Sequence, residues 1–415
     1  MSKKLQISLL TSSIVVVAFA VIGGFGVHAA PASNHNNDGA YTHMQVYSEV
    51  LYHIRGDYVE EPNMPMVTSG ALHGLLESLD ANSSYLSAAE YKTYKQKKAE
   101  GKANIGATIS KRFGYAAVIS VIPSGPADKA GIDNGDIIEA IEGKTTREMS
   151  LAEITSILSG EPGSNLTVSV VRARRAEPQK ITITRDVVSI PAVSEKIFDD
   201  GIAYIKVDAF NKGKAQEIAA KIKAEQSRGI KKMILDLRDC SSGDEQEGIA
   251  TANLFLNHGI ITYLQGQKYP RETYNADMNK AITGLPLVVL VNRGTAGPAE
   301  VVAASILENA RGDVLGDKTF GVGSVQKVID IPDGSALILS VAKYYSPNGK
   351  AIQDTAVTPN IQVADNSDDY IPPDDEDNSA AQEPGKKQRT LQNDEQLKRA
   401  IEVLKNRDAK VASKG

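Results

Sequence analysis

The stretch from Leu287 to Ser305 constrains the fold most, because it joins a continuous aliphatic run, a glycine-rich turn and an amphipathic segment. The run LVVLV at residues 287–291 predicts a buried strand. A sharp Gly-Thr-Ala-Gly-Pro turn follows, and a helix is expected over residues 299–309. A strand, a tight turn and a helix N-terminus place one side chain and nearby backbone N–H groups at a reaction centre. The pattern predicts a nucleophile elbow, yet Gly297 stands where the nucleophile is expected.

Two motifs carry a family resemblance: T-A-G-P-A-E at residues 295–300 and T-F-G-V-G-S-V-Q at residues 319–326. From about residue 43 to 363 the chain resembles the carboxyl-terminal processing peptidases, or tail-specific proteases. These are serine peptidases with a Ser–Lys dyad and an embedded PDZ domain. In the family the two motifs read roughly S-A-S-A-S-E and T-F-G-K-G-S-V-Q. The resemblance implies that Gly297 occupies the nucleophile position and Val322 the base position, and that only the lysine-orienting glutamine, Gln326, is retained.

These substitutions remove the chemistry of a Ser–Lys peptidase. Such an enzyme needs a hydroxyl to attack the carbonyl and a neutral lysine to take its proton; glycine and valine supply neither. One oxyanion donor in the family is the residue after the nucleophile, here Pro298, which has no N–H. The other donor is a loop glycine, which corresponds to Gly243 in the altered stretch D-C-S-S-G. We therefore expect a catalytically degenerate member, a pseudopeptidase, with no functional catalytic residue.

The alternative is an active tail-specific serine-type peptidase with a non-standard catalytic centre. The hydroxyls of Thr295, Ser324, Ser241 and Ser242 lie in the same motifs, and Lys318 precedes Val322 by four residues. Ser and Thr in such loops usually bond their own backbone, and Lys318 has the setting of a solvated charge. Misplacing a reacting group by about 1 Å already costs about 10²-fold, which makes a relocated dyad the weaker interpretation.

Composition limits the other functional classes. The formal charge of −5 gives no basic excess for nucleic acid. Cys240 is the single cysteine and excludes an intramolecular disulfide; it is either a reactive thiol beside the site or, more in keeping with its type, a buried small hydrophobe. The six histidines show no metal-ligand spacing, so neither a metal nor another cofactor is expected.

The N-terminal residues predict export. Lys3 and Lys4 precede a stretch without charges over residues 5–27, and the small-residue sequence Val-His-Ala-Ala follows at residues 27–30. Residues 1–30 fit a signal peptide, and the charge-free stretch is also long enough for a membrane anchor. Either reading places the body in the periplasm or on the extracytoplasmic face of the cell membrane.

The next section, residues 40–100, shows helical spacing of apolar residues and predicts an N-terminal helical arm. In relatives this arm contributes to dimerisation and cradles the PDZ domain. The resemblance therefore implies a homodimer, or a heteromer with active relatives, while an ordinary helical cap on the core fits the residues equally well.

Residues 103–187 resemble a PDZ domain, most specifically through V-I-P-S-G-P-A-D-K-A-G-I and G-D-I-I. The peptide-binding loop and its strand would comprise Asn104, Ile105, Gly106, Ala107, Thr108 and Ile109. Such a loop offers backbone N–H groups to a terminal carboxylate, and its strand edge accepts the peptide by β-augmentation. Residues 151–158 would form the groove helix. This element keeps the residues that binding requires.

Residues 188–363 predict the protease core, an α/β plus β fold that the resemblance describes as ClpP/crotonase-like. An acidic linker is expected over residues 364–393. A last helix, residues 394–406, carries apolar residues on one face and would dock on the core or on a second subunit. The chain as a whole predicts an exported protein that binds protein C-terminal tails or unfolded peptides without cleaving them.

Overall fold

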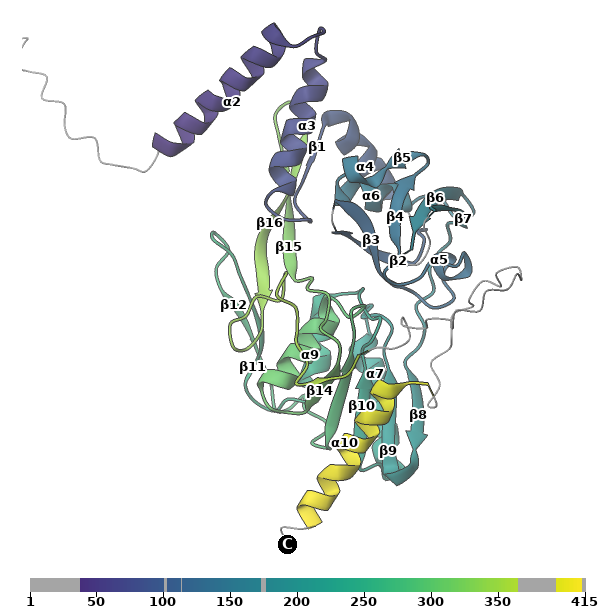
Figure 1. Ribbon diagram of the computed structural model, residues 1–415. Coiled ribbons are helices and arrows are strands. Elements are labelled where there is room, and N and C mark those ends of the chain that lie inside the picture. Colours follow the sequence, from purple (N-terminus) through teal and green to yellow (C-terminus); the bar gives the residue numbers. More distant parts are fainter. Residues whose placement is uncertain (1–37, 101–102, 113, 173–176, 365–392, 413–415) are drawn as a thin grey trace, which may run out of the picture. The chain divides into compact units, whose positions relative to one another are not determined.

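The computed structural model describes residues 38–100, 103–112, 114–172, 177–364 and 393–412 (Figure 1). The expected signal segment lies outside these residues, as does nearly all of the expected acidic linker. Within the described ranges, no helix has the length and apolar character needed to cross a membrane. The chain divides into two compact units, residues 1–68 and 69–415.

The first unit contains helix α2 (Asp38–Asp57) and the first residues of α3 (Met64–Glu77). Helix α2 exposes several large apolar side chains, among them Tyr41, Met44, Val46, Val50 and Tyr52. The helical spacing of apolar residues correctly predicted this helix. Because these side chains are exposed, the spacing does not mark a buried face.

The second unit begins with the rest of α3, and a short strand that the sequence did not predict follows it. Strand β1 (Ser84–Leu86) pairs antiparallel with β16 (Ala336–Tyr345), and α4 (Ala88–Glu100) follows it. Asp80 supports this segment because its carboxylate accepts from Ser83 and, at 3.1 Å, from the Ser340 hydroxyl. Because β1 pairs with β16 and all three of its residues are buried, the segment forms part of the sheet.

The PDZ segment forms an antiparallel sheet in the order β2-β3-β4-β6-β7, with β5 paired to β4. Its strands are β2 (Ala107–Arg112), β3 (Tyr115–Val121), β4 (Ile137–Ile141), β5 (Lys144–Thr145), β6 (Asn165–Val171) and β7 (Gln179–Thr184). Helix α5 (Pro126–Lys129) is short, and α6 (Leu151–Leu158) begins at a Ser150–Glu153 capping box. Strand β2 forms one edge of the sheet.

A second sheet has the order β17-β14-β13-β10-β9-β8. Its strands are β8 (Ser194–Phe198), β9 (Ile202–Lys206), β10 (Lys232–Asp236), β13 (Leu287–Val291), β14 (Asp313–Gly316) and β17 (Ile361–Gln362). All pair in parallel except β8, which runs antiparallel to β9. The predicted strand at residues 287–291 is the central, fully buried β13.

Helices bury both faces of this sheet. Helices α7 (Lys214–Ser227), α8 (Glu245–Asn253) and α9 (Pro298–Glu308) contribute side chains such as Ile218, Ile249 and Val302 to the main core. On the other face, α10 (Glu395–Ala412) packs Leu397, Ala400 and Leu404 against alternate strand residues. The terminal helix thus docks on the core, one of the two outcomes that the sequence left open.

A third, antiparallel sheet joins β1, β16, β11 (Ile260–Gln265) and β12 (Glu272–Asn275), with β15 (Ser324–Asp330) paired to β16. Strands β15 and β16 form a long antiparallel hairpin, in which Asp330 lies opposite Ala336 beside the turn. A mixed α/β core together with antiparallel sheets confirms the predicted fold class.

Candidate active site

The turn between β13 and α9 has the geometry of a nucleophile elbow. Gly297 has φ 59° and ψ −124°, a region that L-residues enter only under strain. A Cβ atom built on Gly297 would meet only the Ser241 carbonyl oxygen, at 3.9 Å. The backbone therefore presents this position to open space, and glycine places no side chain in it.

Glu300, on the first turn of α9, brings the expected nucleophile and base positions together. Its Oε2 accepts from the N–H of Gly297 at 3.1 Å and from the N–H of Val322 at 2.8 Å. Its Oε1 accepts from the N–H of Gly321 at 2.8 Å and from the Thr319 hydroxyl. One fully buried carboxylate thus joins the two loops that carry the altered motifs.

The protonation of Glu300 depends on a balance between burial and hydrogen bonding. Burial raises the pKa of this carboxyl to about 7, although Thr319 and the three backbone N–H donors lower it. One sequence signal marks this residue, an acidic side chain in the first turn of a largely apolar helix. We assign it no role from the sequence alone.

The altered stretch D-C-S-S-G, residues 239–243, lies beside the elbow. The N–H of Ala296 donates to the Cys240 carbonyl at 2.9 Å. Gly243 packs against the backbone of Phe210, and a Cβ atom there would lie 2.4 Å from the Phe210 carbonyl, so no other residue fits. Pro298 is the first residue of α9, where a missing N–H suits the helix but supplies no donor to an oxyanion.

Asp239 fixes the start of this loop and links it to the PDZ segment. Its Oδ1 accepts from the side-chain amides of Asn292 and Asn134, both at 2.8 Å. Ser241 also hydrogen-bonds to Ser120 of β3 through the two hydroxyls. Asn292 and Asn134 were not singled out from the sequence, since a lone asparagine in a turn carries no distinctive signal.

The alternative nucleophiles are engaged in structural contacts. The Thr295 hydroxyl is fully buried, donates to the Leu237 carbonyl at 2.8 Å and accepts from the Asn292 N–H at 3.0 Å. Lys318 is exposed. The Ser324 hydroxyl accepts from Asn82 at 3.0 Å and from the exposed Gln326 at 2.8 Å.

Two further residues of the altered loop have equally local roles. The Ser242 carbonyl accepts from the Phe210 N–H at 2.8 Å. Cys240 is fully buried, and burial raises the pKa of its thiol to about 12. The thiol therefore has the properties of a small hydrophobe rather than of a nucleophile, the more favoured of the two interpretations from the sequence.

The expected peptide-binding loop has a defined shape. The N–H of Gly106 donates to Oδ1 of Asn104 at 2.7 Å, and the Gly106 carbonyl accepts from Ile122 at 2.7 Å. Ile105 is buried in the PDZ core. Ala107, Thr108 and Ile109 continue into β2 along the edge of the sheet, the position that β-augmentation requires.

Comparisons with known proteins agree with this architecture. The profile of peptidase family S41 matches residues 201–363, and a PDZ-domain profile matches residues 118–172. The carboxy-terminal-processing protease of Bartonella bacilliformis is 30% identical over 81% of this chain and 79% of its own length. The carboxy-terminal processing protease CtpA of Bacillus subtilis is 30% identical over 75% of this chain and 66% of its own length.

A solved structure gives the same result. The photosystem II D1 C-terminal processing protease superposes with a TM-score of 0.63 at 25% identity, over 77% of this chain and 92% of that one. The fold and the elbow define a serine peptidase scaffold with a PDZ domain. The chain belongs to the carboxyl-terminal processing protease family, peptidase family S41.

Proposed function

We propose that this protein is a pseudopeptidase, which binds peptides through its PDZ domain and has a binding or regulatory role in the cell envelope. One observation carries the proposal: Gly297 and Val322 meet at the same oxygen of Glu300. The scaffold thus holds the positions of nucleophile and base close together, while neither residue has a group that can attack a carbonyl or accept a proton.

The proposed ligand is a protein C-terminal tail or an unfolded peptide. Its last residues would add a strand beside β2, and its carboxylate would face the loop at Asn104–Gly106. The oxyanion position supports binding without turnover, because Pro298 offers no N–H to a developing negative charge. Gly243 alone would remain as a donor.

The domain division that we propose follows the sequence: a helical arm over residues 40–100, a PDZ domain over 103–187, a protease core over 188–363 and a C-terminal helix from 394. We further propose export, with residues 1–30 as a signal peptide or anchor. Pairing with a second copy or with active relatives is part of the same proposal and rests on the family resemblance of the arm.

The test combines the full chain with an unstructured protein that ends in an apolar tail. Binding is followed by fluorescence anisotropy and cleavage by mass spectrometry in the same sample. We expect binding without cleavage. Cleavage that Thr295→Ala or Lys318→Ala abolishes would establish a relocated catalytic centre and overturn the proposal, and absence of both binding and cleavage would overturn the assignment of the ligand.

A further inference from the structure

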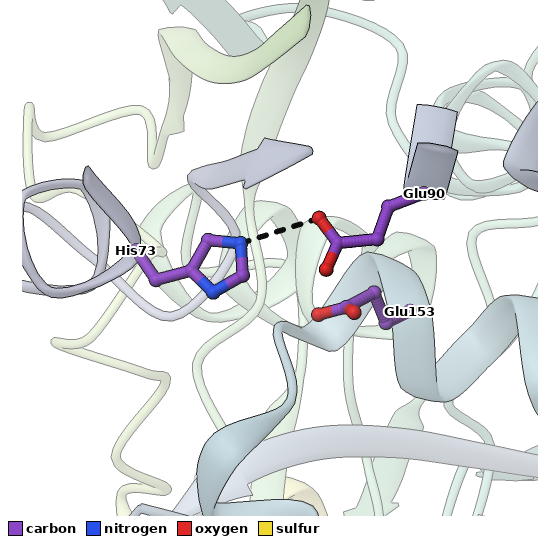
Figure 2. A group of neighbouring side chains, drawn as sticks. All are labelled: His73, Glu90 and Glu153. Atoms are coloured by element: carbon purple, nitrogen blue, oxygen red, sulfur yellow. Dashed lines mark ion pairs between the residues drawn. The ribbon is translucent and has the colours of Figure 1, made fainter. Parts of the chain in front are cut away.

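Three potential metal ligands converge outside the altered site. His73 lies on α3, Glu90 on α4 and Glu153 on α6, and Figure 2 shows their side chains pointing toward one another. One ligand atom from each lies within 4.8 Å of the other two. The three residues are far apart in the sequence, so the histidine spacing examined above could not reveal this cluster.

The histidine nitrogen has an unusual environment for a ring that only fills space. Nε2 of His73 is buried and makes no hydrogen bond within the described part of the chain. Its nearest charged neighbour is Oε2 of Glu90, at the long ion-pair distance of 3.5 Å. Two ligands of one tetrahedral ion, each about 2.1 Å from it, lie roughly 3.4 Å apart, so the separation leaves room for a shared ion.

Both carboxylates are held in place by the backbone. Glu90 accepts from the Ser87 N–H at 2.7 Å, and Glu153 accepts from the Ser150 N–H at 2.7 Å. In each case the glutamate completes a capping arrangement at the start of its helix. Such hydrogen bonds orient metal-binding carboxylates before the ion arrives. The Tyr85 ring packs against the His73 ring, with centroids 5.5 Å apart, and restricts the movement of the imidazole.

The local charge favours a cation. Glu90 and Glu153 together carry two negative charges beside an imidazole that is neutral in its metal-binding form. Glu77, which also faces His73, is paired with Lys111. Lys111 in turn donates to the Arg147 and Met149 carbonyls. The neighbouring Glu90 raises the pKa of His73, and the same contact lowers the pKa of Glu90 to about 2.

We propose that His73, Glu90 and Glu153 bind one divalent transition-metal ion and thereby link helix α3 to the groove helix α6. A nitrogen and two carboxylate oxygens suit zinc or its first-row neighbours. The His73 and Glu90 side chains are 18% and 31% exposed, which leaves access for the ion and for water as a further ligand.

The test titrates Zn²⁺ into the chelator-treated full chain by calorimetry. We expect one ion per chain at this site, and we expect His73→Gln and Glu153→Gln each to weaken its binding at least about tenfold. Glutamine also serves in capping boxes, so Glu153→Gln keeps the start of α6. The visible absorption of bound Co²⁺ should show a nitrogen–oxygen site in the wild type and lose it in both variants.

The matched control is His53→Gln on α2, since His53 also lies between two carboxylates, Glu49 at 3.3 Å and Asp57 at 2.5 Å. It should leave the zinc affinity unchanged. Zinc binding that is lost in the His53 variant and retained in the His73 variant would overturn the proposal. So would an absence of zinc binding by the wild type, which would identify the cluster as a pH-sensitive His73–Glu90 ion pair.

Discussion

Gly297 and Val322 donate their backbone N–H groups to the same oxygen of Glu300, at 3.1 and 2.8 Å. One carboxylate therefore joins the two loops that our proposal assigns to a Ser–Lys site, although neither glycine nor valine has a group for that chemistry. The Glu300 carboxylate holds these two loops together. The proposal can therefore be tested by substituting serine at position 297 and lysine at position 322.

Gly297→Ser alone should give no measurable peptide cleavage, because the base and one oxyanion donor would still be missing. The combination of Gly297→Ser, Pro298→Ala and Val322→Lys should give turnover, since it returns all three parts; a missing nucleophile alone costs about 10⁶-fold. Cleavage is measured on the apolar-tailed substrate.

The control for this series is Gly297→Ala with the same two companions. It carries the same backbone strain, about 1–3 kcal/mol, without a hydroxyl. Turnover by the serine variant alone would show that another group acts as the base, contrary to our account.

The free energy of unfolding should fall as the pH rises toward neutrality, because Glu300 loses its proton in this range. Its folded pKa of about 7 lies above the ordinary 4.5, so the folded chain holds this proton more tightly than the unfolded chain. The stabilisation is complete below about pH 4.5 and is lost as the pH passes through 7. The change amounts to about 3 kcal/mol at most, measured by urea unfolding at a series of pH values.

Glu300→Gln isolates this effect, because glutamine does not titrate. Between pH 5 and 7, the free energy of unfolding of the variant should change less than that of the wild type. Equal slopes for the two proteins would mean that Glu300 keeps one protonation state in this range, and the assigned pKa would be wrong.

Gly106→Val should abolish peptide binding by the PDZ segment. Gly106 has φ 71°, and a Cβ atom there would lie 3.3 Å from side-chain atoms of both Pro126 and Val188. The added bulk would displace the loop that receives the carboxylate. Anisotropy with a labelled C-terminal peptide measures the loss.

Gly143→Val is the matched control, because Gly143 has φ 80° and open space around it in the turn between β4 and β5. It should bear similar backbone strain and keep the affinity. Amidation of the peptide's terminal carboxylate should weaken binding to the wild type; equal affinity for both peptides would argue against recognition of a free C-terminus.

Arg238→Met should destabilise the core by about 3–5 kcal/mol, since it leaves buried carboxylates without their counter-ion. Arg238 is 1% exposed and contacts Asp236 at 2.6 Å and Asp394 at 2.8 Å. Guanidinium chloride unfolding measures the loss. Lys405→Met, which breaks the exposed pair with Asp200, should leave the free energy of unfolding nearly unchanged, and a similar loss in both variants would refute the assigned role.

Much of the fold was predictable because local patterns and long-range packing agree. The aliphatic run at residues 287–291 is β13, and the capping residues before residue 151 start α6 where expected. Strand β8 was missed although its partner β9 follows it almost directly. Strand β1 was missed because it is short and depends on β16, which is distant in the sequence, for its hydrogen bonds. Sequence patterns carry no information about such partners.

The losses that we propose for the site come from its motifs, whereas the residues that support its loops carry little sequence signal. Gly297, Pro298 and Val322 stand out because a motif prescribes another residue at each position. Glu300 and Asn292 support the same loops through contacts between segments that are distant along the chain. The cluster at His73 depends on three separate helices, which only the folded chain brings together.

The contact between Arg238 and Asp394 joins residues that are 156 positions apart. During synthesis Asp236 and Arg238 leave the ribosome long before the residues of α10. The parallel sheet can assemble by then, but one of its faces lacks its cover and Arg238 lacks its second carboxylate. The last steps of folding must therefore wait until the end of the chain has emerged, and a prematurely terminated chain would expose an apolar surface that quality-control proteases can recognise.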